Sequence, residues 1–296
     1  MSEIMTLKSD ESIHIRDPEM FEAKIARMAS ASDRSLQVIA DFDGTITFHK
    51  TSSNQLKRGL SCHGVIGKYP GLTAEYRAEV QAMEDHFGPL EKDPGLSPED
   101  RLQVMTDWWA RSHGLMIAQQ ISMSHIDEMV RDAKSRGLFG LRDKAADFLH
   151  LLRSRKIPCV VLSAGIAVVI EELLDMESIP VDDLTMVVSN QTIADANGII
   201  QAFVEPVIHG LSKRQVLKGV LDSSITRRDR RNVLLLGDMP HDVEAALAVE
   251  DRLDVLSIGF LHDIKHLEDY MALYDIVLTD DQGYDNVISI LNKLIS

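Results

Sequence analysis

The sequence has few cysteines and no long apolar segment. Cys62 and Cys159 are its two cysteines among 296 residues, too few for the disulfide framework that stabilises many small secreted proteins. We therefore expect both thiols to be reduced. No apolar run approaches the roughly 20 residues that a membrane-spanning helix requires, and the polar start of the sequence lacks the apolar core of a signal peptide. These absences favour a cytoplasmic protein that has no membrane partner.

Positive charge is also scarce. The sequence holds 46 acidic and 31 basic residues, which gives a formal net charge of −15. Proteins that bind nucleic acids rely on clustered Lys and Arg side chains to neutralise phosphates, so we expect no nucleic-acid partner. The one basic run, 227–231, directly precedes an apolar segment and is typical of a solvated connection. A hydrophobic content of 45% and a charged content of 26% are typical of a soluble globular enzyme.

Five short apolar runs rich in Val, Ile and Leu recur along the chain. Each lacks the alternation of a half-exposed strand, so it predicts a strand buried on both faces, as in a parallel sheet. Helical patterns accompany these runs, and the alternation of strand and helix is typical of a doubly wound α/β fold. The runs lie at 35–40, 158–165, 232–238, 253–260 and 274–279, and the helical patterns at 141–155, 167–176, 213–222 and 241–250.

The segment from 51 to 137 interrupts this alternation. Polar helical patterns follow one another there, separated by breaks that contain Pro and Gly, and no internal repeat or low-complexity linker occurs. These patterns lie at 74–87, 98–114 and 124–136. We therefore predict an α/β core formed by 1–50 and 138–296, and an inserted helical cap, 51–137, that packs over the sheet.

The strongest chemical signal is Asp41-Phe-Asp43-Gly-Thr, which directly follows the predicted strand at 35–40. Two carboxylates at the end of a buried strand would be costly to bury alone, and a bound cation would neutralise them. An acidic turn after the strand is the alternative, because Asp and Gly are common in such turns. The motif alone leaves both interpretations open.

Three further polar sites follow other predicted elements. A hydroxyl and two small residues end the second apolar run ahead of a helix, where backbone N–H groups can bind phosphate oxygens. A lysine opens a helical pattern and offers an ammonium group to a phosphate. A second pair of carboxylates follows the third run. These residues are Ser163, Ala164 and Gly165, then Lys213, and finally Asp238 and Asp242.

Each of these sites alone also has an ordinary structural interpretation. Ser163 fits a helix N-cap, Lys213 a solvated surface residue and Asp242 a carboxylate in the first turn of a helix. Together they are more specific, because the carboxyl ends of the strands of an open α/β sheet border one crevice. Phosphoryl transfer requires such a set: a nucleophile, a carboxyl for proton transfer, oxygen ligands for a hard cation and positive donors for phosphate oxygens.

At these positions the sequence resembles the haloacid dehalogenase superfamily of aspartate-nucleophile phosphatases, whose four motifs occur in order. It is also similar to the cytosolic 5′-nucleotidase III family, known as pyrimidine 5′-nucleotidases, over nearly the whole chain from about Leu36 onward. The four motifs are DFDGT (41–45), LSAG (162–165), Lys213 and GDMPHD (237–242). The closer likeness extends through DWWARSHGL (107–115), IPCVVLSAGI (157–166), VVSN (187–190), IGFL (258–261) and YDIVLTDD (274–281).

The resemblance implies a magnesium-dependent enzyme that hydrolyses nucleoside 5′-monophosphates, with pyrimidine nucleotides and 7-methylguanosine monophosphate as expected substrates. Asp41 would be the nucleophile that forms an aspartyl-phosphate. Asp43 would protonate the leaving oxygen and then activate water. Asp41, the backbone carbonyl of Asp43 and Asp238 would hold Mg²⁺, with Asp242 supporting that site.

The resemblance also implies the contacts with the substrate. Ser163, Ala164 and Lys213 would bind the phosphate, and Glu91 and Ser112 of the cap would contact the nucleoside. We expect a monomer whose partner is a small-molecule nucleotide.

Several positions differ from the family pattern. The segment that reads GDSQGD in the family has Pro240 and His241 before its last Asp, and Asp107 stands where the family has Glu. These departures bear on substrate preference, because they leave the nucleophile and the principal metal positions unchanged. Next to Asp107 stand Trp108 and Trp109, and since neighbours on a helix point about 100° apart, we expect one of the two at most to face the crevice.

Two alternatives remain open. The superfamily motifs determine the chemistry while the cap selects the substrate, so a phosphatase of a phosphosugar or of phosphoserine would carry the same motifs. A phosphoacceptor signalling domain also combines an acidic cluster, a hydroxyl residue and a lysine at a parallel sheet. Such a domain keeps its aspartyl-phosphate as a long-lived signal. Here Asp43 offers a general acid/base beside Asp41, and the cap is available to enclose a substrate.

Overall fold

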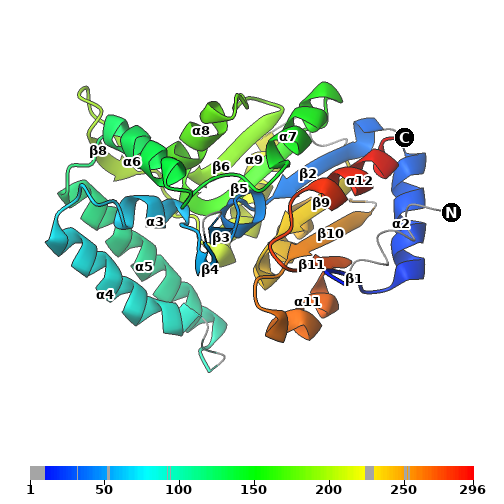
Figure 1. The fold of residues 1–296 in the computed structure, drawn as a ribbon, viewed down its shortest axis with the longest axis horizontal. Helices are drawn as coiled ribbons and strands as arrows, with labels where there is room; N and C mark the ends of the chain where they lie inside the picture. Colours follow the sequence, from blue (N-terminus) through cyan, green and yellow to red (C-terminus); the bar gives the residue numbers. More distant parts are fainter. Residues whose placement is uncertain are drawn as a thin grey trace.

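A mostly parallel sheet forms the centre of the molecule. The computed structural model (Figure 1) describes residues 11–31, 33–51, 54–91, 93, 95–223, 230–249, 252 and 254–296. Within these residues a seven-stranded sheet has the strand order β1, β11, β10, β9, β2, β5, β6. Strand β1 is antiparallel to β11, and the other neighbours are parallel. The strands are β1 Ile13–Ile15, β2 Leu36–Ala40, β5 Cys159–Ile166, β6 Thr185–Asn190, β9 Asn232–Gly237, β10 Val255–Phe260 and β11 Ile276–Leu278.

The five strands predicted from apolar runs are confirmed as β2, β5, β9, β10 and β11. Strands β1 and β6, which the sequence pattern does not predict, lie at the two edges of the sheet. An edge strand has a neighbour on one side only, so its side chains are less uniformly apolar. Accordingly, β1 contains the half-buried His14 and β6 ends in Ser189 and Asn190.

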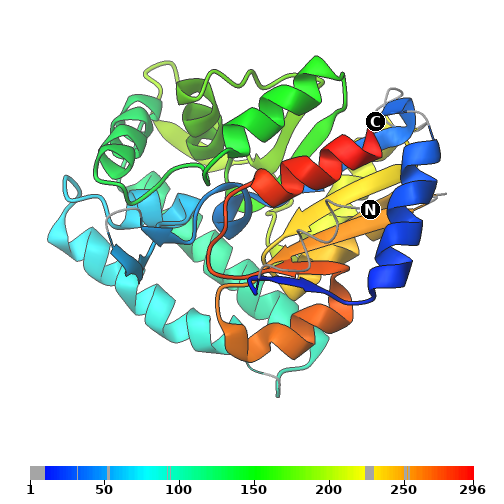
Figure 2. The same ribbon diagram turned by 45° about the vertical axis from the view of Figure 1, so that its right-hand side comes forward.

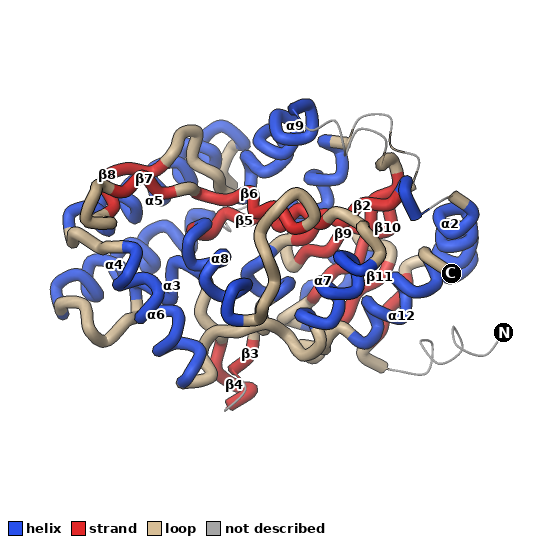
Figure 3. The backbone as a smooth tube through the Cα atoms, turned by 90° about the horizontal axis from the view of Figure 1, so that it is seen from above, coloured by secondary structure: helices blue, strands red, loops and turns tan. Residues whose placement is uncertain are grey.

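Helices cover both faces of the sheet (Figure 1, Figure 3). On one face, Val38 and Ala40 of β2 pack in one apolar cluster with α2, α7, α8 and α12. On the other face, Ile39 packs with α9 and with the helix η4 that follows β9. The predicted doubly wound α/β fold is thereby confirmed. The helices are α2 Pro18–Ser30, α7 Ala145–Ser154, α8 Ala167–Met176, α9 Lys213–Ser223, α11 Leu267–Leu273 and α12 Asp285–Leu294.

The segment after β9 differs from the prediction. The pattern at 241–250 predicts an α-helix, but the structure has a 3-10 helix, η4, at Pro240–Ala248. At its start, Oδ2 of Asp242 accepts hydrogen bonds from the backbone N–H groups of Asp238 and Met239 at 3.2 and 3.0 Å. These bonds hold the chain in a tight turn directly after the strand.

Most of the chain between β2 and β5 lies beside the sheet as helices (Figure 1, Figure 2). The three predicted helices are confirmed as α4, α5 and α6, and α4 packs along α5. The division into a core and a cap at 51–137 remains a prediction. The elements are η2 Phe42–Ile46, β3 Lys50–Thr51, β4 Asn54–Arg58, α3 Cys62–Gly67, α4 Ala74–Glu91, α5 Pro98–Ala118 and α6 Met123–Ser135.

A hairpin that follows β6 packs against these helices. It consists of β7 Thr192–Ala194 and β8 Ile200–Phe203. The backbone N–H of Met123, at the start of α6, donates to Gly198 at 2.9 Å, and His113 of α5 stacks on Phe203 with ring centroids 3.7 Å apart. Residues from beyond β6 therefore support the helical region. Among the described helices, none is long and apolar enough to cross a bilayer.

Candidate active site

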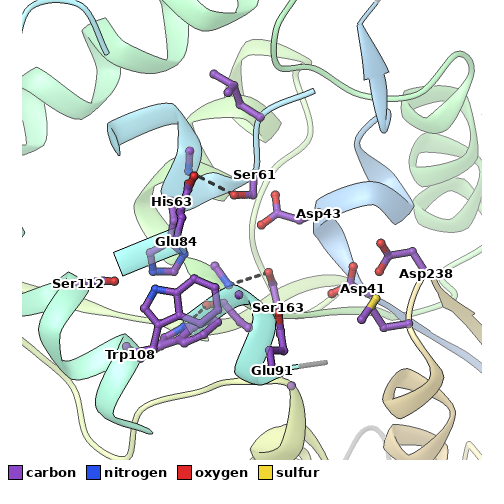
Figure 4. A pocket seen from close by; sticks show the side chains of 18 of the residues that line it. Asp41, Asp43, Ser61, His63, Glu84, Glu91, Trp108, Ser112, Ser163 and Asp238 are labelled. Atoms are coloured by element: carbon purple, nitrogen blue, oxygen red, sulfur yellow. Dashed lines mark hydrogen bonds between the residues drawn. The ribbon is translucent and has the colours of Figure 1, made fainter. Parts of the chain in front are cut away.

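A cavity of about 500 Å³ lies between the carboxyl ends of the central strands and the helices α3, α4 and α5 (Figure 4). It brings together residues that are far apart in the sequence but that the motifs predict to meet. Asp242 lies behind this lining. The predicted site residues that line the cavity are Asp41, Asp43, Glu91, Ser112, Ser163, Ala164, Lys213 and Asp238.

Asp41 and Lys213 form the centre of the cavity floor. Asp41 directly follows β2 and is 7% exposed. Lys213, the first residue of α9, donates to Oδ1 of Asp41 at 2.5 Å and to Oδ1 of Asp242 at 2.7 Å. Burial opposes the charge on the ammonium, yet Asp242 and Asp41 raise the pKa of Lys213 above its ordinary value. Burial raises the pKa of Asp41, with Lys213 acting in the opposite direction.

The carboxylates of this floor fit a hard cation. Asp41, Asp238 and Asp242 each offer an oxygen, and these oxygens lie within 4.8 Å of one another. Burial, together with the charge of Asp242, raises the pKa of Asp238 to about 8. One ammonium group therefore does not compensate the negative charge of the cluster, and carboxylate oxygens are the ligands that Mg²⁺ takes in proteins. Asp41 and Asp238, which both face the cavity, are the suitable ligands.

Asp242 is engaged on both of its oxygens. Oδ1 accepts from Lys213, and Oδ2 accepts from the backbone N–H groups of Asp238 and Met239. Burial would raise the pKa of Asp242, but the Lys213 ammonium holds it below its ordinary value. Asp242 is thus placed to hold Lys213 and the loop after β9.

Asp43 is held by a residue of the helical region. Its two oxygens accept the backbone N–H of Cys62 at 3.0 and 3.1 Å, and the Cys62 thiol lies 3.2 Å from Oδ1. Burial raises the pKa of Asp43, which favours its protonated form. Gly44 follows in the left-handed region at φ +85°. Only glycine fits there, because a Cβ would lie 2.6 Å from Oδ2 of Asp238.

The last residues of β5, where its pairing with β6 shifts register between Leu162 and Ile166, are fixed by hydrogen bonds from three directions. Oγ of Ser163 accepts from the backbone N–H of Gly165 at 3.0 Å. The carbonyl of Ala164 accepts from Nδ2 of Asn190 at 2.8 Å and from the indole N–H of Trp109 at 2.9 Å. The segment that is predicted to bind phosphate is therefore tied to the sheet edge and to α5.

Aromatic side chains form the opposite wall of the cavity. Trp108 stacks on Phe87 with ring centroids 5.7 Å apart, and it meets Trp109 edge to face at 5.3 Å. Both tryptophans line the cavity. The expectation that at most one of them faces the crevice was wrong. Although neighbours on a helix point apart, the indole of Trp109 is long enough to reach the carbonyl of Ala164, and Trp108 lines the same cavity.

The positions that depart from the family pattern have different surroundings. His241 lines the cavity beside Lys213, so this departure changes the floor. Asp107 accepts a hydrogen bond from Gln103 at 2.8 Å along α5 and does not belong to the lining.

Several lining residues carry no signal in the sequence. They lie on β4, α3 and α4 or, for Lys68, directly after α3, and these elements are short or polar, so little in their local pattern points to a cavity. His63 is the clearest case: burial lowers its pKa to about 4, and its ring stacks on that of His113 at 5.8 Å. Its adjacency to Cys62 at the start of α3 is the one signal that could have selected it. The others are Arg58, Lys68, Met83 and Glu84.

Comparisons with known proteins give consistent results. Residues 45–295 match the UMPH-1 family, described as pyrimidine 5′-nucleotidase. The 7-methylguanosine phosphate-specific 5′-nucleotidase A of Xenopus laevis is 32% identical over 283 residues, which cover 95% of each chain. The putative cytosolic 5′-nucleotidase 3 of Caenorhabditis elegans is 30% identical and covers 97% of this chain and 77% of its own.

Solved structures agree. The crystal structure of cytosolic 5′-nucleotidase IIIB bound to cytidine superposes with a TM-score of 0.85 at 26% identity and covers 98% of this chain and 96% of its own. A phosphoserine phosphohydrolase-like protein from Francisella tularensis has a TM-score of 0.52 at 16% identity over 88% of this chain and 99% of its own, a likeness of fold alone.

Proposed function

Because the chain belongs to the pyrimidine 5′-nucleotidase family, we propose that it hydrolyses nucleoside 5′-monophosphates through an aspartyl-phosphate on Asp41, with Mg²⁺ as cofactor. It is an enzyme, a phosphoric monoester hydrolase of the 5′-nucleotidase type. The observation that carries the finer proposal is the floor of the cavity, where Asp41, Asp43 and Lys213 face the same space. A cytosolic relative supports the cytoplasm as the place of action.

The floor supplies the groups that two successive displacements at phosphorus need. An oxygen of Asp41 attacks the phosphorus, and the bond between phosphorus and the 5′ oxygen breaks while Asp43 gives that oxygen a proton. The nucleoside leaves. Asp43 then accepts a proton from a water molecule that attacks the phosphoaspartate, so phosphate leaves and both carboxyl groups return to their starting states.

The phosphate oxygens have positive and neutral donors close by. Lys213 lies against Asp41, and Ser163 and Ala164, near the end of β5, border the same space. Mg²⁺, when held by Asp41, Asp238 and the carbonyl of Asp43, would favour the ionised carboxylates and offset the charge of the phosphoryl oxygens. Asp242 supports this arrangement through its bond to Lys213.

The aromatic wall supports a flat base as the other half of the substrate. Trp108 and Trp109 offer ring surfaces for stacking, and Glu91 and Ser112 line the same cavity. A carboxylate accepts from the exocyclic amine of cytosine or guanine, and an indole favours a positively charged base such as 7-methylguanine. We propose CMP and 7-methylguanosine monophosphate as better substrates than AMP, with UMP also accepted.

Phosphate release from a panel of phosphomonoesters tests this proposal. The purified protein is assayed with Mg²⁺ and with chelator on CMP, UMP, 7-methylguanosine monophosphate, AMP, ribose 5-phosphate and phosphoserine. We expect metal-dependent activity with the highest kcat/KM for the first three nucleotides. Sugar phosphates or phosphoserine hydrolysed as well as nucleotides would refute the substrate class, and undiminished activity in chelator would refute the metal dependence.

A further inference from the structure

Cys62 makes three contacts with the carboxylate of Asp43. Its backbone N–H lies 3.0 and 3.1 Å from the two oxygens, and its thiol lies 3.2 Å from Oδ1. The two residues are 19 positions apart and belong to different elements, since Asp43 lies in η2 and Cys62 begins α3. The position of the Asp43 side chain is therefore set by the start of α3.

The space around the Cys62 side chain is closely filled. Cys62 is fully buried, and a Cβ added to Gly165 would lie 2.8 Å from its sulfur and 2.9 Å from its Cβ. The same added Cβ would lie 3.1 Å from Oγ of Ser163. Cys62 is thus packed between Asp43 on one side and Ser163 and Gly165, near the end of β5, on the other. A side chain with a bulkier end would displace one of these two neighbours.

We propose that Cys62 is a positioning residue for Asp43, which it holds with its N–H and its thiol in the orientation that serves proton transfer. A thiol is protonated at neutral pH and donates weakly to an oxygen. Oδ1 accepts from both the N–H and the thiol, whereas Oδ2 accepts from the N–H alone, so Oδ2 is the oxygen that carries the proton to the leaving group. This inference rests on the proposed acid/base function of Asp43, and the experiment below separates the two.

The test compares a poor and a good leaving group. A nucleoside 5′ oxygen needs a proton as it leaves, whereas 4-nitrophenolate departs without one, so a misplaced acid impairs CMP hydrolysis selectively. The quantity measured is kcat/KM, because it reports the steps from free enzyme and substrate up to and including the first irreversible step. We expect Cys62→Ala to lower kcat/KM for CMP about 10- to 100-fold and for 4-nitrophenyl phosphate less than about threefold. Cys62→Ser, which keeps a donor, should restore most of the CMP activity.

Cys159 provides the matched control, because it is also a buried cysteine but lies in β5 outside the cavity lining. Cys159→Ala should leave the ratio of the two kcat/KM values unchanged. If Cys62→Ala lowers the two values in equal proportion, or leaves both unchanged, Cys62 is a packing residue and the inference is wrong.

A double-mutant cycle with Asp43→Asn separates positioning from packing. If Cys62 acts through Asp43, then Cys62→Ala lowers kcat/KM for CMP in the wild-type background and has almost no further effect beside Asp43→Asn. Additive losses overturn the inference. Should Cys62→Ala fail to fold, Cys62→Gly, which also lacks a donor and adds no bulk to this closely filled space, replaces it in both backgrounds under the same criterion.

The same cycle keeps the two proposals apart. If Asp43→Asn itself leaves the ratio between CMP and 4-nitrophenyl phosphate unchanged, the proposed acid function of Asp43 fails. If Asp43→Asn shifts this ratio and Cys62→Ala does not, Asp43 keeps its function and the positioning by Cys62 alone is refuted.

Discussion

The floor and the opposite wall of the cavity hold their side chains in different ways. The floor consists of Asp41, Asp43, Asp238 and Lys213, and Asp242 lies behind it, bonded to Lys213. The aromatic wall consists of Trp108 and Trp109, and Phe87 supports it by stacking on Trp108. In the floor, Lys213 donates to Asp41 and Asp242 at 2.5 and 2.7 Å, and backbone N–H groups hold the carboxylates of Asp43 and Asp242. In the wall, rings lie on rings and both tryptophans are half-buried. Directional bonds fix one arrangement, whereas ring stacking tolerates several.

This difference follows from what each region has to do. A buried charge without a partner is costly, so the floor is stable only if each carboxylate has a donor or a cation. Such fixed groups are also what a reaction at phosphorus requires. A wall of stacked rings gains most of its energy from apolar contact and can fit different bases. Changes in the floor should therefore affect the rate of chemistry, and changes in the wall should affect the choice of substrate.

The largest effect is expected from Asp41→Asn in the floor. An amide is a poor nucleophile and lacks the charge that a cation requires, so kcat should fall by more than about 10³-fold while the fold is retained. Steady-state kinetics and circular dichroism measure the two effects. Asp107→Asn, on α5 outside the cavity lining, is the control and should behave as wild type. Residual activity above about a hundredth of the wild-type kcat would exclude Asp41 as nucleophile.

A smaller loss is expected from Asp43→Asn. The amide can neither protonate the leaving oxygen nor activate water, a contribution of typically 10² to 10⁴ in rate. Binding of Mg²⁺ should largely persist, because the proposed ligand at this position is the backbone carbonyl. The loss should therefore appear mainly in kcat. An effect confined to KM would contradict the proposed role.

The floor could be predicted from the sequence because each of its residues stands next to a recognisable element. Asp41 and Asp238 directly follow β2 and β9, which are apolar runs, and Lys213 opens an amphipathic helix. In a parallel sheet these ends meet at one edge whatever the details of packing. Local pattern and topology together were enough to place them.

The wall and its supports could not be predicted in the same way. The bond from Trp109 to Ala164 joins residues 55 positions apart, and the bonds from Cys62 to Asp43 join residues 19 apart. Neither contact follows from a periodic pattern, since each depends on how the helices of the 51–137 segment are placed on the core. Strand β6 also escaped prediction, because its edge position gives it a mixed composition.

A third prediction concerns His113 of α5, the helix that carries the wall, and the stability of the fold at low pH. His113 is 4% exposed and stacks on Phe203 and His63. The pKa of His113 is lowered from 6.5 to about 3, chiefly by burial and to a smaller extent by the neighbouring His63. The unfolded chain then takes up this proton at a higher pH than the folded chain, so stability is lost as pH falls from about 6.5 towards 3. At pH 5 this histidine alone should lower the free energy of unfolding by about 2 kcal/mol relative to pH 7.5.

The variant His113→Phe isolates this contribution. It keeps a ring in the stack, and the Nε2 atom it removes has no hydrogen-bond partner among the described residues. Urea unfolding at pH 7.5 and pH 5 should show a smaller loss of stability in this variant than in the wild type. His150→Phe, at an exposed position, should leave the loss unchanged. Equal losses in the wild type and in His113→Phe would show that His113 is not a source of acid sensitivity.

The smallest effect is expected from Glu91→Gln at the edge of the wall, and it tests whether this region reads the base. Glu91 and Glu84 both lie on α4 and line the cavity, and Glu84 lies 3.4 Å from Lys68. If Glu91 accepts a hydrogen bond from the exocyclic amine of cytosine, its amide variant, which keeps an acceptor oxygen but loses the negative charge, should lower the kcat/KM ratio of CMP to UMP about tenfold, because uracil has a carbonyl in place of that amine. Hydrolysis of 4-nitrophenyl phosphate should not change, because that ester has no base. Glu84→Gln is the matched control and should preserve the ratio. An unchanged ratio in Glu91→Gln would leave base selection to the stacked rings alone, and the separation between a floor that reacts and a wall that selects would then rest on Trp108 and Trp109.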